Sequence, residues 1–335
     1  MSVDHAPLTP VAAHVSPIES PLASPFVLKN HAALLRVLDY LKAHNYAFTA
    51  VTPLTHSRVN ARSENAYAQD LGGIFGWSRL FSAEVAGAEL LRLMQAADIL
   101  EPHDNGWRSR IRVASLGSHM FIHSAFPTVE SNAIFFGPDT YRFIAAIERH
   151  LQRRTAPIRR AVDIGCGAGP GAIISAKKLP TAEVFAVDIN ESALQVTQLN
   201  AQAAAARNVH VRYSDLLKDT NGLFDFIVAN PPYLLDPSQR TYRHGGGALG
   251  AGLSEAIVAT AIERLSIGGS LMLYTGVAIE NGVDPFLAKI KTLVPPNFSC
   301  TYQEIDPDIF SEELLQGAYA AVDRIAAITL EVTRR

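Results

Sequence analysis

The sequence has few cysteines and no long apolar run. Of its 335 residues only Cys166 and Cys300 are cysteines, which excludes a disulfide framework and a Cys-x-x-Cys metal site. Such sparing use of cysteine is typical of a protein kept in the reducing cytoplasm. No stretch approaches the roughly 18 apolar residues that a membrane-spanning helix needs, and the first residues lack the basic and apolar regions of a signal peptide. We therefore expect a cytoplasmic protein without a membrane partner.

A large excess of charge of one sign is also missing. The chain has 29 Lys and Arg against 32 Asp and Glu, a formal net charge of -3. Binding to a phosphate backbone depends on clustered positive charge, so this balance argues against a nucleic-acid partner. Most of the 11 histidines fall in the first 125 residues, but none has His-Glu-x-x-His spacing or a nearby frame of cysteines and carboxylates. We expect no metal site.

The first 125 residues predict a leader and a small helical domain. Residues 1–27 contain five prolines, which indicates an extended leader. The spacing of apolar residues predicts two helices and then two short strands, at residues 29–44, 82–97, 111–114 and 120–122. A helix followed by a hairpin outlines a winged helix, but a basic recognition helix is missing. We expect residues 28–125 to cover a substrate site or to form a homodimer.

From residue 126 to residue 335, strands and helices alternate, which predicts a doubly wound α/β domain. Strands are expected at residues 161–164, 184–187, 209–213, 226–229, 271–274, 298–304 and 325–332. Helices fit between them at residues 171–178, 192–205, 254–265, 285–293 and 311–316. The last strand could run antiparallel at the end of the sheet. The predicted fold is a mostly parallel, seven-stranded, Rossmann-like sheet with a smaller N-terminal domain that is helical or winged-helix-like.

A glycine-rich turn follows the first expected strand of this domain. Residues 163–169 (DIGCGAG) lead from a strand into a helix, and glycines let the backbone approach a ligand closely. Asp188 ends the next strand, where a carboxylate can accept hydrogen bonds from both hydroxyls of a ribose. A nicotinamide dinucleotide is one candidate ligand, but the Asp163 carboxylate would repel a pyrophosphate. A sulfonium nucleoside, held through its ammonium end, fits the turn better.

A second motif stands at the carboxyl end of the strand expected at residues 226–229. It reads Asn230-Pro231-Pro232-Tyr233. Consecutive prolines fix the backbone and remove donors, so the turn offers the Asn230 side-chain oxygen and the Pro231 carbonyl as acceptors. Two convergent acceptors suit an NH₂ group, and Tyr233 adds an aromatic face for a planar group. Ligands bind at this end of the strands in open α/β sheets.

Together these motifs resemble those of the class I S-adenosylmethionine-dependent methyltransferases. DIGCGAG, VDIN at residues 187–190, SDLL at residues 214–217 and NPPY occur in the order and spacing of that family. The similarity is closest to the branch of release-factor glutamine methyltransferases and other NPPY-type N-methyltransferases. It covers residues 130–335 and implies S-adenosyl-L-methionine as the cofactor.

The resemblance also implies a role for each motif. Asp163 and the glycines would line the methionine moiety, Asp188 would bind the ribose, and Asp215 would meet the adenine edge. The stretch 136–143, FGPDTYRF, looks like the family's lid-forming segment. The residues expected to bind the cofactor are Asp163, Gly165, Cys166, Gly167, Gly169, Asp188, Ile189, Asp215, Leu216, Asn230 and Tyr141, and those expected to be catalytic are Asn230, Pro231 and Tyr233.

Three departures separate the sequence from release-factor methyltransferases. The N-terminal region does not resemble their helical bundle. Residues 240–247 (RTYRHGGG) are basic, aromatic and glycine-rich, and residues 304–308 add three carboxylates. Each of these segments either borders the substrate pocket or is a surface loop. The acceptor is therefore left open between a small molecule and a protein.

One other reaction and one non-catalytic role are the alternatives to methyl transfer. The α-amine of the cofactor could attack its own γ-carbon, as in azetidine-2-carboxylate synthases, which need no second substrate and release methylthioadenosine. A non-catalytic cofactor-binding protein would not need the Asn230–Tyr233 turn. N-methyl transfer is the reading that the motifs favour, because an amine or amide NH₂ matches both acceptors.

Overall fold

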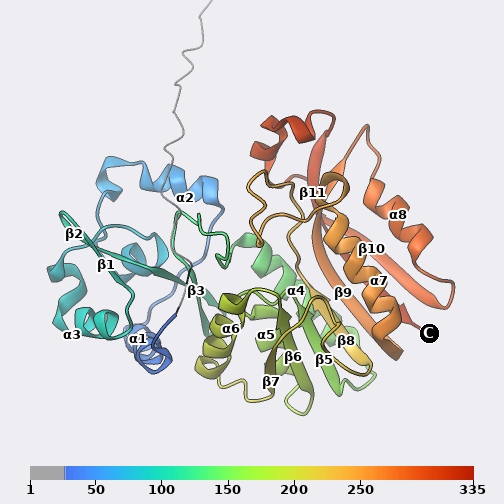
Figure 1. The fold of residues 1–335 in the computed structure, drawn as a ribbon, viewed down its shortest axis with the longest axis horizontal. Helices are drawn as coiled ribbons and strands as arrows, with labels where there is room; N and C mark the ends of the chain where they lie inside the picture. The colour runs from blue at the N-terminus through green and yellow to red at the C-terminus, as the bar shows by residue number, and fades with distance from the viewer. Residues whose placement is uncertain (1–25, 27) are drawn as a thin grey trace, which may run out of the picture.

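The computed structural model describes residues 26 and 28–335, and the leader predicted at residues 1–27 lies almost wholly outside this range. Figure 1 shows a small N-terminal region, coloured blue to green, beside a larger domain built on one sheet. The N-terminal region contains helices α1 (His31–Ala43), α2 (Pro53–Asn60) and α3 (Ala83–Ala96), short helical turns at Ser63–Asn65 and Gly72–Gly76, and strands β1 (Leu100–His103), β2 (Gly106–Ser109), β3 (Ile111–Leu116) and β4 (His119–Ser124).

The two helices predicted in the N-terminal region are present. Asn30 begins α1, because its side-chain oxygen accepts a hydrogen bond from the Ala33 N–H. In α3 the backbone at Gly87 has φ +74, so two helical pieces meet there. The predicted strands pair as the hairpin β3–β4, but β1 and β2 form a second hairpin directly after α3.

The larger domain has one sheet of seven strands in the order β10-β11-β9-β8-β5-β6-β7. Strands β9, β8, β5, β6 and β7 are parallel, as predicted. Their bounds and those of the last two strands are β5 (Arg160–Ile164), β6 (Glu183–Asp188), β7 (Val209–Tyr213), β8 (Phe224–Ala229), β9 (Leu265–Ile279), β10 (Phe298–Asp306) and β11 (Arg324–Arg334). The last strand is antiparallel, but β10 takes the edge, because β11 inserts between β9 and β10.

Helices cover both faces of this sheet. They are α4 (Pro138–Arg153), α5 (Pro170–Lys178), α6 (Glu191–Ala203), α7 (Gly252–Arg264) and α8 (Pro285–Leu293). Side chains alternate along each strand: on β8, Phe226 and Val228 pack with the core cluster that includes residues of α4–α6, whereas Ile227 and Ala229 pack with that of α7 and α8. The alternation gives a three-layer domain with buried strands (Figure 1).

Two elements differ from the sequence-based prediction. Helix α4, which includes most of the predicted lid segment, is a regular helix of 16 residues instead of a lid loop. The helix expected at residues 311–316 is a short 3-10 turn, Ser311–Leu315, followed by another at Gly317–Tyr319. The buried residues Phe143, Ile144 and Ile147 of α4 do follow helical spacing, so this helix could have been predicted from the pattern. The turn Ser311–Leu315 buries only Glu313.

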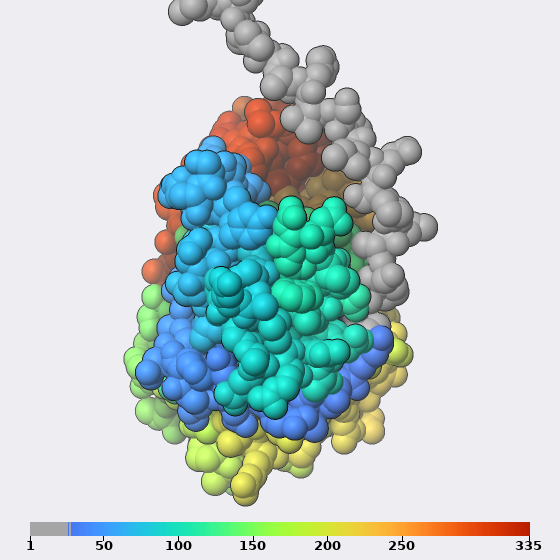
Figure 2. All heavy atoms as spheres, turned by 90° about the vertical axis from the view of Figure 1, so that its left-hand side faces the viewer, coloured from blue at the N-terminus to red at the C-terminus, as the bar shows by residue number. Residues whose placement is uncertain are grey.

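The N-terminal region packs closely against the sheet domain. Apolar residues of α1 and α3 belong to the same buried cluster as residues of α4, α5 and α6. Figure 2 views this side of the molecule, where the N-terminal elements form most of the front surface. The boundary at residue 125 remains a prediction, because the core is continuous across it. Within residues 28–335, no helix has the length and apolar character needed to cross a bilayer.

Candidate active site

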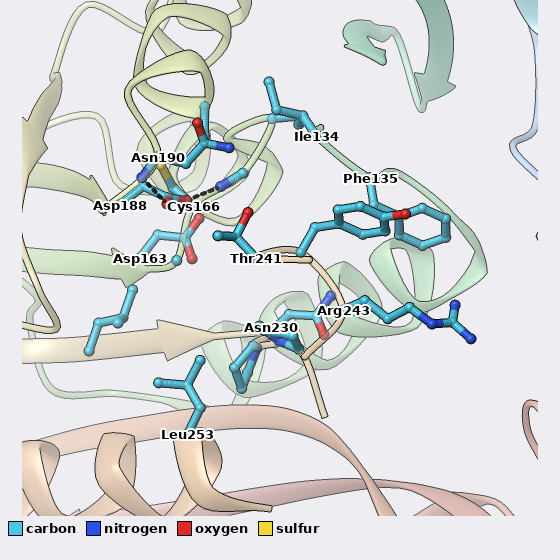
Figure 3. A pocket seen from close by; sticks show the side chains of 18 of the residues that line it. Ile134, Phe135, Asp163, Cys166, Asp188, Asn190, Asn230, Thr241, Arg243 and Leu253 are labelled. Carbon is cyan, nitrogen blue, oxygen red and sulfur yellow. Dashed lines mark hydrogen bonds between the residues drawn. The ribbon is translucent and has the colours of Figure 1, made fainter. Parts of the chain in front are cut away.

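The site lies where three parallel strands end side by side. Register places Ile164 of β5 beside Val187 of β6 and Ala229 of β8. The residues that follow these strands therefore meet at one edge of the sheet and line one cavity (Figure 3). This juxtaposition is the one that the order of the motifs predicted.

The glycine turn after β5 leaves open space toward the cavity. Gly165 and Gly167 have φ of +70 and +55, and a Cβ at either position would meet no atom within 4 Å. Cys166 and Ala168 line the cavity between and after them. Gly169 does not line it; its left-handed backbone (φ +83) begins α5 instead. The turn is therefore a cradle with room for a ligand against its backbone.

Asp163 lies near the end of β5 with 2% of its surface exposed, and it lines the cavity. Its Oδ2 accepts a hydrogen bond of 2.8 Å from the Ala172 N–H in the first turn of α5. Burial, opposed by this hydrogen bond, raises the pKa of Asp163 to about 7. One oxygen is thus committed to the helix, and the other is left for a cationic group.

Asp188 ends β6 beside the glycine turn. Its Oδ2 accepts from Gly167 N at 3.0 Å and its Oδ1 accepts from Asn190 N at 2.9 Å (dashed lines in Figure 3). Burial raises the pKa of Asp188 above its usual value, while these N–H groups lower it. Each carboxylate oxygen has a second lone pair, so the fixed carboxylate can still accept from vicinal hydroxyls. Ile189 follows it with 53% of its surface exposed on the cavity wall.

The segment after β7 forms the far end of the cavity. Ser214, Asp215 and Leu216 line it, as predicted for the adenine end. The Asp215 carboxylate is ion-paired with Lys218. This end of the cavity therefore combines an apolar side chain with polar backbone and a carboxylate.

The Asn-Pro-Pro-Tyr turn follows β8 and borders the cavity with all four residues. Among the described residues, none hydrogen-bonds to the Asn230 side chain or to the Pro231 carbonyl, so both acceptors are free to meet a ligand. Figure 3 shows Asn230 below Thr241 in this view of the pocket. Two unpaired acceptors at a rigid turn are the geometry predicted for holding an NH₂ group.

Tyr233 is held by its surroundings and is 7% exposed. Its hydroxyl donates to Oδ2 of Asp139 at 2.7 Å. Its ring packs over Gly276 of β9, where an added Cβ would come within 2.4 Å of ring atoms. The hydroxyl is therefore engaged by Asp139, and the ring is fixed against β9 where it borders the cavity.

The basic loop at residues 240–247 borders the cavity through Thr241, Tyr242 and Arg243. Its charges are compensated: Arg240 forms a bidentate pair with Asp236, and Arg243 pairs with the buried Glu313. The loop therefore lines the cavity mainly with aromatic and hydroxyl groups, because the positive charges of its arginines are already paired.

The three C-terminal carboxylates do not reach the cavity. Glu304 pairs with Arg324 at 3.0 Å and Asp306 pairs with Arg142 at 2.8 Å, while Asp308 is exposed. The segment therefore does not border the pocket, and it is not simply a surface loop either, because Glu304 and Asp306 belong to the edge strand β10.

A cover joins the basic loop to the linker before α4. The Thr241 hydroxyl donates to the Ser131 carbonyl and the Tyr242 hydroxyl donates to the Thr128 carbonyl, both at 2.9 Å. The rings of Phe135 and Tyr242 stack with centroids 6.1 Å apart. We call residues 126–135 and 236–247 the cover; it forms the wall across from Asn230.

Tyr141 is not among the residues that line this cavity. It lies one turn into α4, and its hydroxyl accepts a hydrogen bond of 2.9 Å from the Ala50 N–H of the N-terminal region. A second hollow, between the β3–β4 hairpin and α4, has Tyr141 on its wall. The prediction that it contacts the cofactor is not supported by this placement.

Several lining residues were not predicted. They are Ile134, Phe135, Asp139, Thr140, Phe143, Leu253, Ile257 and Phe310. Asp139 and Thr140 belong to a segment that the sequence singled out, but its polar residues gave no indication of which would face the cavity. Phe143 lies in the same segment, and the remaining residues come from segments that carry no motif.

The site fits S-adenosylmethionine on three observations. The glycine cradle is open where a Cβ would point, the Asp188 carboxylate is fixed beside it, and the buried Asp163 carboxylate can balance an ammonium group. A pyrophosphate would meet both carboxylates, which disfavours a dinucleotide.

Comparison with known proteins agrees with this reading. Residues 145–281 match the family model described as the methyltransferase small domain. The chain is 33% identical over 160 residues to the release factor glutamine methyltransferase of Koribacter versatilis, covering 44% of this chain and 56% of that protein. It is 31% identical over 144 residues to a 4-amino-L-phenylalanine/4-methylamino-L-phenylalanine methyltransferase of Streptomyces pristinaespiralis, covering 40% and 49%.

Among solved structures, the tRNA m1G37 methyltransferase of M. jannaschii is similar over 70% of this chain and 60% of that chain, with a TM-score of 0.47 and 13% identity. The chain spans about half the length of the two curated relatives it matches.

The strand order, the lining of the site and the match of residues 145–281 are those of a class I S-adenosylmethionine-dependent methyltransferase domain. Residues 145–281 match the methyltransferase small domain, and over the aligned part the chain is similar to release factor glutamine methyltransferases.

Proposed function

We propose that the chain is an N-methyltransferase that methylates an amino or amide nitrogen of a small molecule or a protein. The observation that carries the proposal is the pair of free acceptors, Asn230 Oδ1 and the Pro231 carbonyl, on the same cavity as the glycine cradle. If the methyl group were transferred to a hydroxyl or to a carbon, at least one of these two hydrogen-bond acceptors would have no hydrogen to accept.

S-adenosylmethionine supplies an electrophilic methyl group on its sulfonium when it is bound. The chain's own contribution is to orient the nitrogen, since correct placement alone can supply about 7–11 kcal/mol of the barrier. Asn230 and Pro231 would hold the two N–H hydrogens, leaving the lone pair directed at the methyl carbon. The extra proton on the methylated nitrogen can leave after transfer, so the turn itself need not supply a base.

The relatives support nitrogen as the acceptor. One is named for glutamine and the other for the amino group of 4-amino-L-phenylalanine and its methylated form. Both names describe an NH₂ or NH group, although the first acts on a protein and the second on a small molecule. The reaction at nitrogen is therefore supported more strongly than the size of the acceptor.

The cover favours a small acceptor. Thr241 and Tyr242 fasten the basic loop to the linker over the acceptor side of the cavity. A protein chain would have to displace these hydrogen bonds to reach Asn230, whereas a small amine would not. The compensated charges of Arg240 and Arg243 also argue against a nucleic-acid phosphate as the group recognised here.

The test is a substitution that separates cofactor binding from turnover. Asn230→Ala removes one of the two acceptors, and we expect kcat to fall by about 100-fold because the nitrogen loses its orientation. Affinity for S-adenosylmethionine, measured by calorimetry, should stay within about 3-fold, since the glycine cradle and Asp188 are unchanged.

Asn221→Ala is the matched control. It makes the same change at an exposed asparagine in the loop before β8. Unchanged turnover in this control, with the loss confined to Asn230→Ala, would support the proposal. Full activity in Asn230→Ala would exclude the turn as the site of the reacting nitrogen.

A further inference from the structure

A buried carboxylate in the first turn of α4 connects to the acceptor turn. Asp139 is 6% exposed and lies 94 residues before Tyr233 in the chain. Its Oδ2 accepts from the Tyr233 hydroxyl at 2.7 Å, and its Oδ1 accepts from the Tyr274 hydroxyl on β9 at 2.6 Å. One carboxylate thus holds two tyrosines, of which one belongs to the Asn-Pro-Pro-Tyr turn.

The charge of Asp139 is balanced inside the fold. Arg142, one helical turn later, donates to Oδ1 of Asp139 at 3.2 Å and to Oδ2 of Asp306 at 2.8 Å. The position of Asp139 in the first turn of α4 adds the favourable interaction of a carboxylate with a helix N-terminus. The carboxylate therefore needs no ligand to compensate its burial.

The ring of Tyr233 is fixed from the other side as well. It rests on Gly276 of β9 and lies 6.1 Å, between centroids, from the ring of Phe310. Burial raises the pKa of the Tyr233 hydroxyl far above its usual value, and the Asp139 charge raises it further. The hydroxyl stays protonated and remains a donor to Asp139.

We propose that Asp139 is a positioning residue for methyl transfer: it holds the Tyr233 hydroxyl and so sets the position of the whole Asn230–Tyr233 turn. The inference rests on the proposed function, because it assumes that the reacting nitrogen is held by this turn. Asp139 itself does not take up the proton of the reaction, since its oxygens are already occupied by Tyr233, Tyr274 and Arg142.

A positioning role and a merely structural role have different kinetic consequences. A displaced turn still admits the acceptor but presents its nitrogen out of line, so kcat falls while the acceptor KM changes little. A structural defect lowers the amount of folded protein and leaves the kinetics of the folded fraction unchanged. The comparison of kcat with KM therefore separates the two roles.

The kinetic test is a double-mutant cycle of Asp139→Asn and Tyr233→Phe. We expect each variant to lower kcat by about 10- to 100-fold, with the acceptor KM within about 3-fold. The double variant should be no slower than the slower single variant, because both substitutions disrupt the same contact between the Tyr233 hydroxyl and the Asp139 carboxylate. Effects that multiply in the double variant would overturn the proposal.

The matched control is Tyr302→Phe, which removes a tyrosine hydroxyl on the edge strand β10 that donates to Asp284; neither residue lines the cavity. Turnover in this variant should equal that of the unsubstituted protein. Turnover is measured as the cofactor consumed, which is the sum of the S-adenosylhomocysteine and the methylthioadenosine formed. A protein that formed only methylthioadenosine would refute the proposed methyl transfer, while the cycle would still report whether Asp139 positions the turn.

A spectroscopic test does not depend on activity. In protein labelled with ¹³C at the tyrosine Cζ, the signals of Tyr233 and Tyr274 are identified by their loss in Tyr233→Phe and in Tyr274→Phe. Asp139→Asn should shift both signals, because the acceptor charge is removed from both hydroxyls. A Tyr233 signal that stays in place would show that Asp139 does not hold this side chain, and it would overturn the proposal.

Discussion

The ring of Tyr233 lies directly against the backbone of Gly276, with the position of a Cβ at Gly276 only 2.4 Å from two ring carbons. Gly276 belongs to β9, and Tyr233 ends the acceptor turn after β8. The absence of a side chain on one strand therefore fixes the position of an aromatic ring on the neighbouring segment.

Gly276→Ala should displace the Tyr233 ring and lower kcat. A contact below 3.0 Å requires the ring or the strand to move, and a shift of about 1 Å at the reacting centre can cost about 100-fold in rate. We expect cofactor affinity to change little, because Asp163 and Asp188 lie across the cavity. Gly317→Ala is the control, because a Cβ at Gly317 would meet no atom within 4 Å. Gly268 in β9 is unsuitable, because its φ of +74 makes any substitution strained. Steady-state kinetics with normal kcat in Gly276→Ala would contradict this account of the turn.

Asp188→Asn should weaken S-adenosylmethionine binding by about 10- to 100-fold, the loss expected from hydrogen bonds to a charged acceptor. Asparagine keeps the size of the side chain, but only one of its two ends accepts hydrogen bonds. Isothermal calorimetry gives the affinity, and Asp219→Asn, an exposed carboxylate in the same domain, provides the control. Equal affinities for the two variants would mean that Asp188 does not hold the ribose.

Folding stability should decrease as the pH falls from about 6.5 toward about 4, in part because of His56. This fully buried ring stacks on Phe126, and its Nδ1 lies 3.4 Å from the Arg112 guanidinium. Burial, followed by the charge of Arg112, lowers the pKa of His56 to about 4. The unfolded chain binds a proton between these two pH values and the folded protein does not, so protons favour unfolding.

Urea titrations across this pH range measure the effect. His56→Gln should reduce the slope of the unfolding free energy against pH by about 1.4 kcal/mol per pH unit, the contribution of one proton. His44→Gln changes an exposed histidine and should leave the slope as it is. An unchanged slope in His56→Gln would show that His56 is already protonated in the fold at neutral pH or is solvated.

Asn200→Ala should destabilise the junction between the N-terminal region and the glycine turn. The fully buried Asn200 amide pairs with both the N–H and the carbonyl of Ile122 on β4, and donates to the Ala168 carbonyl, all at 2.9–3.0 Å. Buried groups left without partners cost about 1–3 kcal/mol each, so a loss of about 3 kcal/mol is expected.

Hydrogen exchange locates this loss. In Asn200→Ala the Ile122 amide should exchange faster, since its acceptor is the removed side-chain oxygen. Asn208→Ala provides the comparison, because Asn208 bonds only to carbonyls within the sheet domain. If the Ile122 amide lost its protection from exchange equally in both variants, its exchange would be controlled by global unfolding and not by this junction.

The strands and the two chemical motifs could be predicted because their information is local. Each motif follows a short apolar strand, and in a parallel sheet the carboxyl ends of neighbouring strands meet. The positions of Asp188 and Asn230 on one cavity followed from that rule. Helix α8 was predicted with its bounds because Pro285 begins it and Asp284 caps it.

The remaining features depend on long-range contacts. The pairing of Asp139 with Tyr233 joins residues 94 apart, and that with Tyr274 joins residues 135 apart. No periodicity indicates such pairs. Likewise, Tyr141 was placed near the cofactor from a motif, whereas its hydroxyl faces Ala50 of the N-terminal region. Interrupting glycines also hid the full length of β9, which extends from Leu265 to Ile279.

The measurement closest to the central claim is the identity of the product formed from S-adenosylmethionine. The purified protein is incubated with the cofactor alone, and then with 4-aminophenylalanine, other small amines and a release factor, and the products are resolved by mass spectrometry. We predict S-adenosylhomocysteine only when an acceptor is present, together with an acceptor heavier by one methyl group on nitrogen. Methylthioadenosine formed from the cofactor alone would contradict methyl transfer and would favour intramolecular cyclisation.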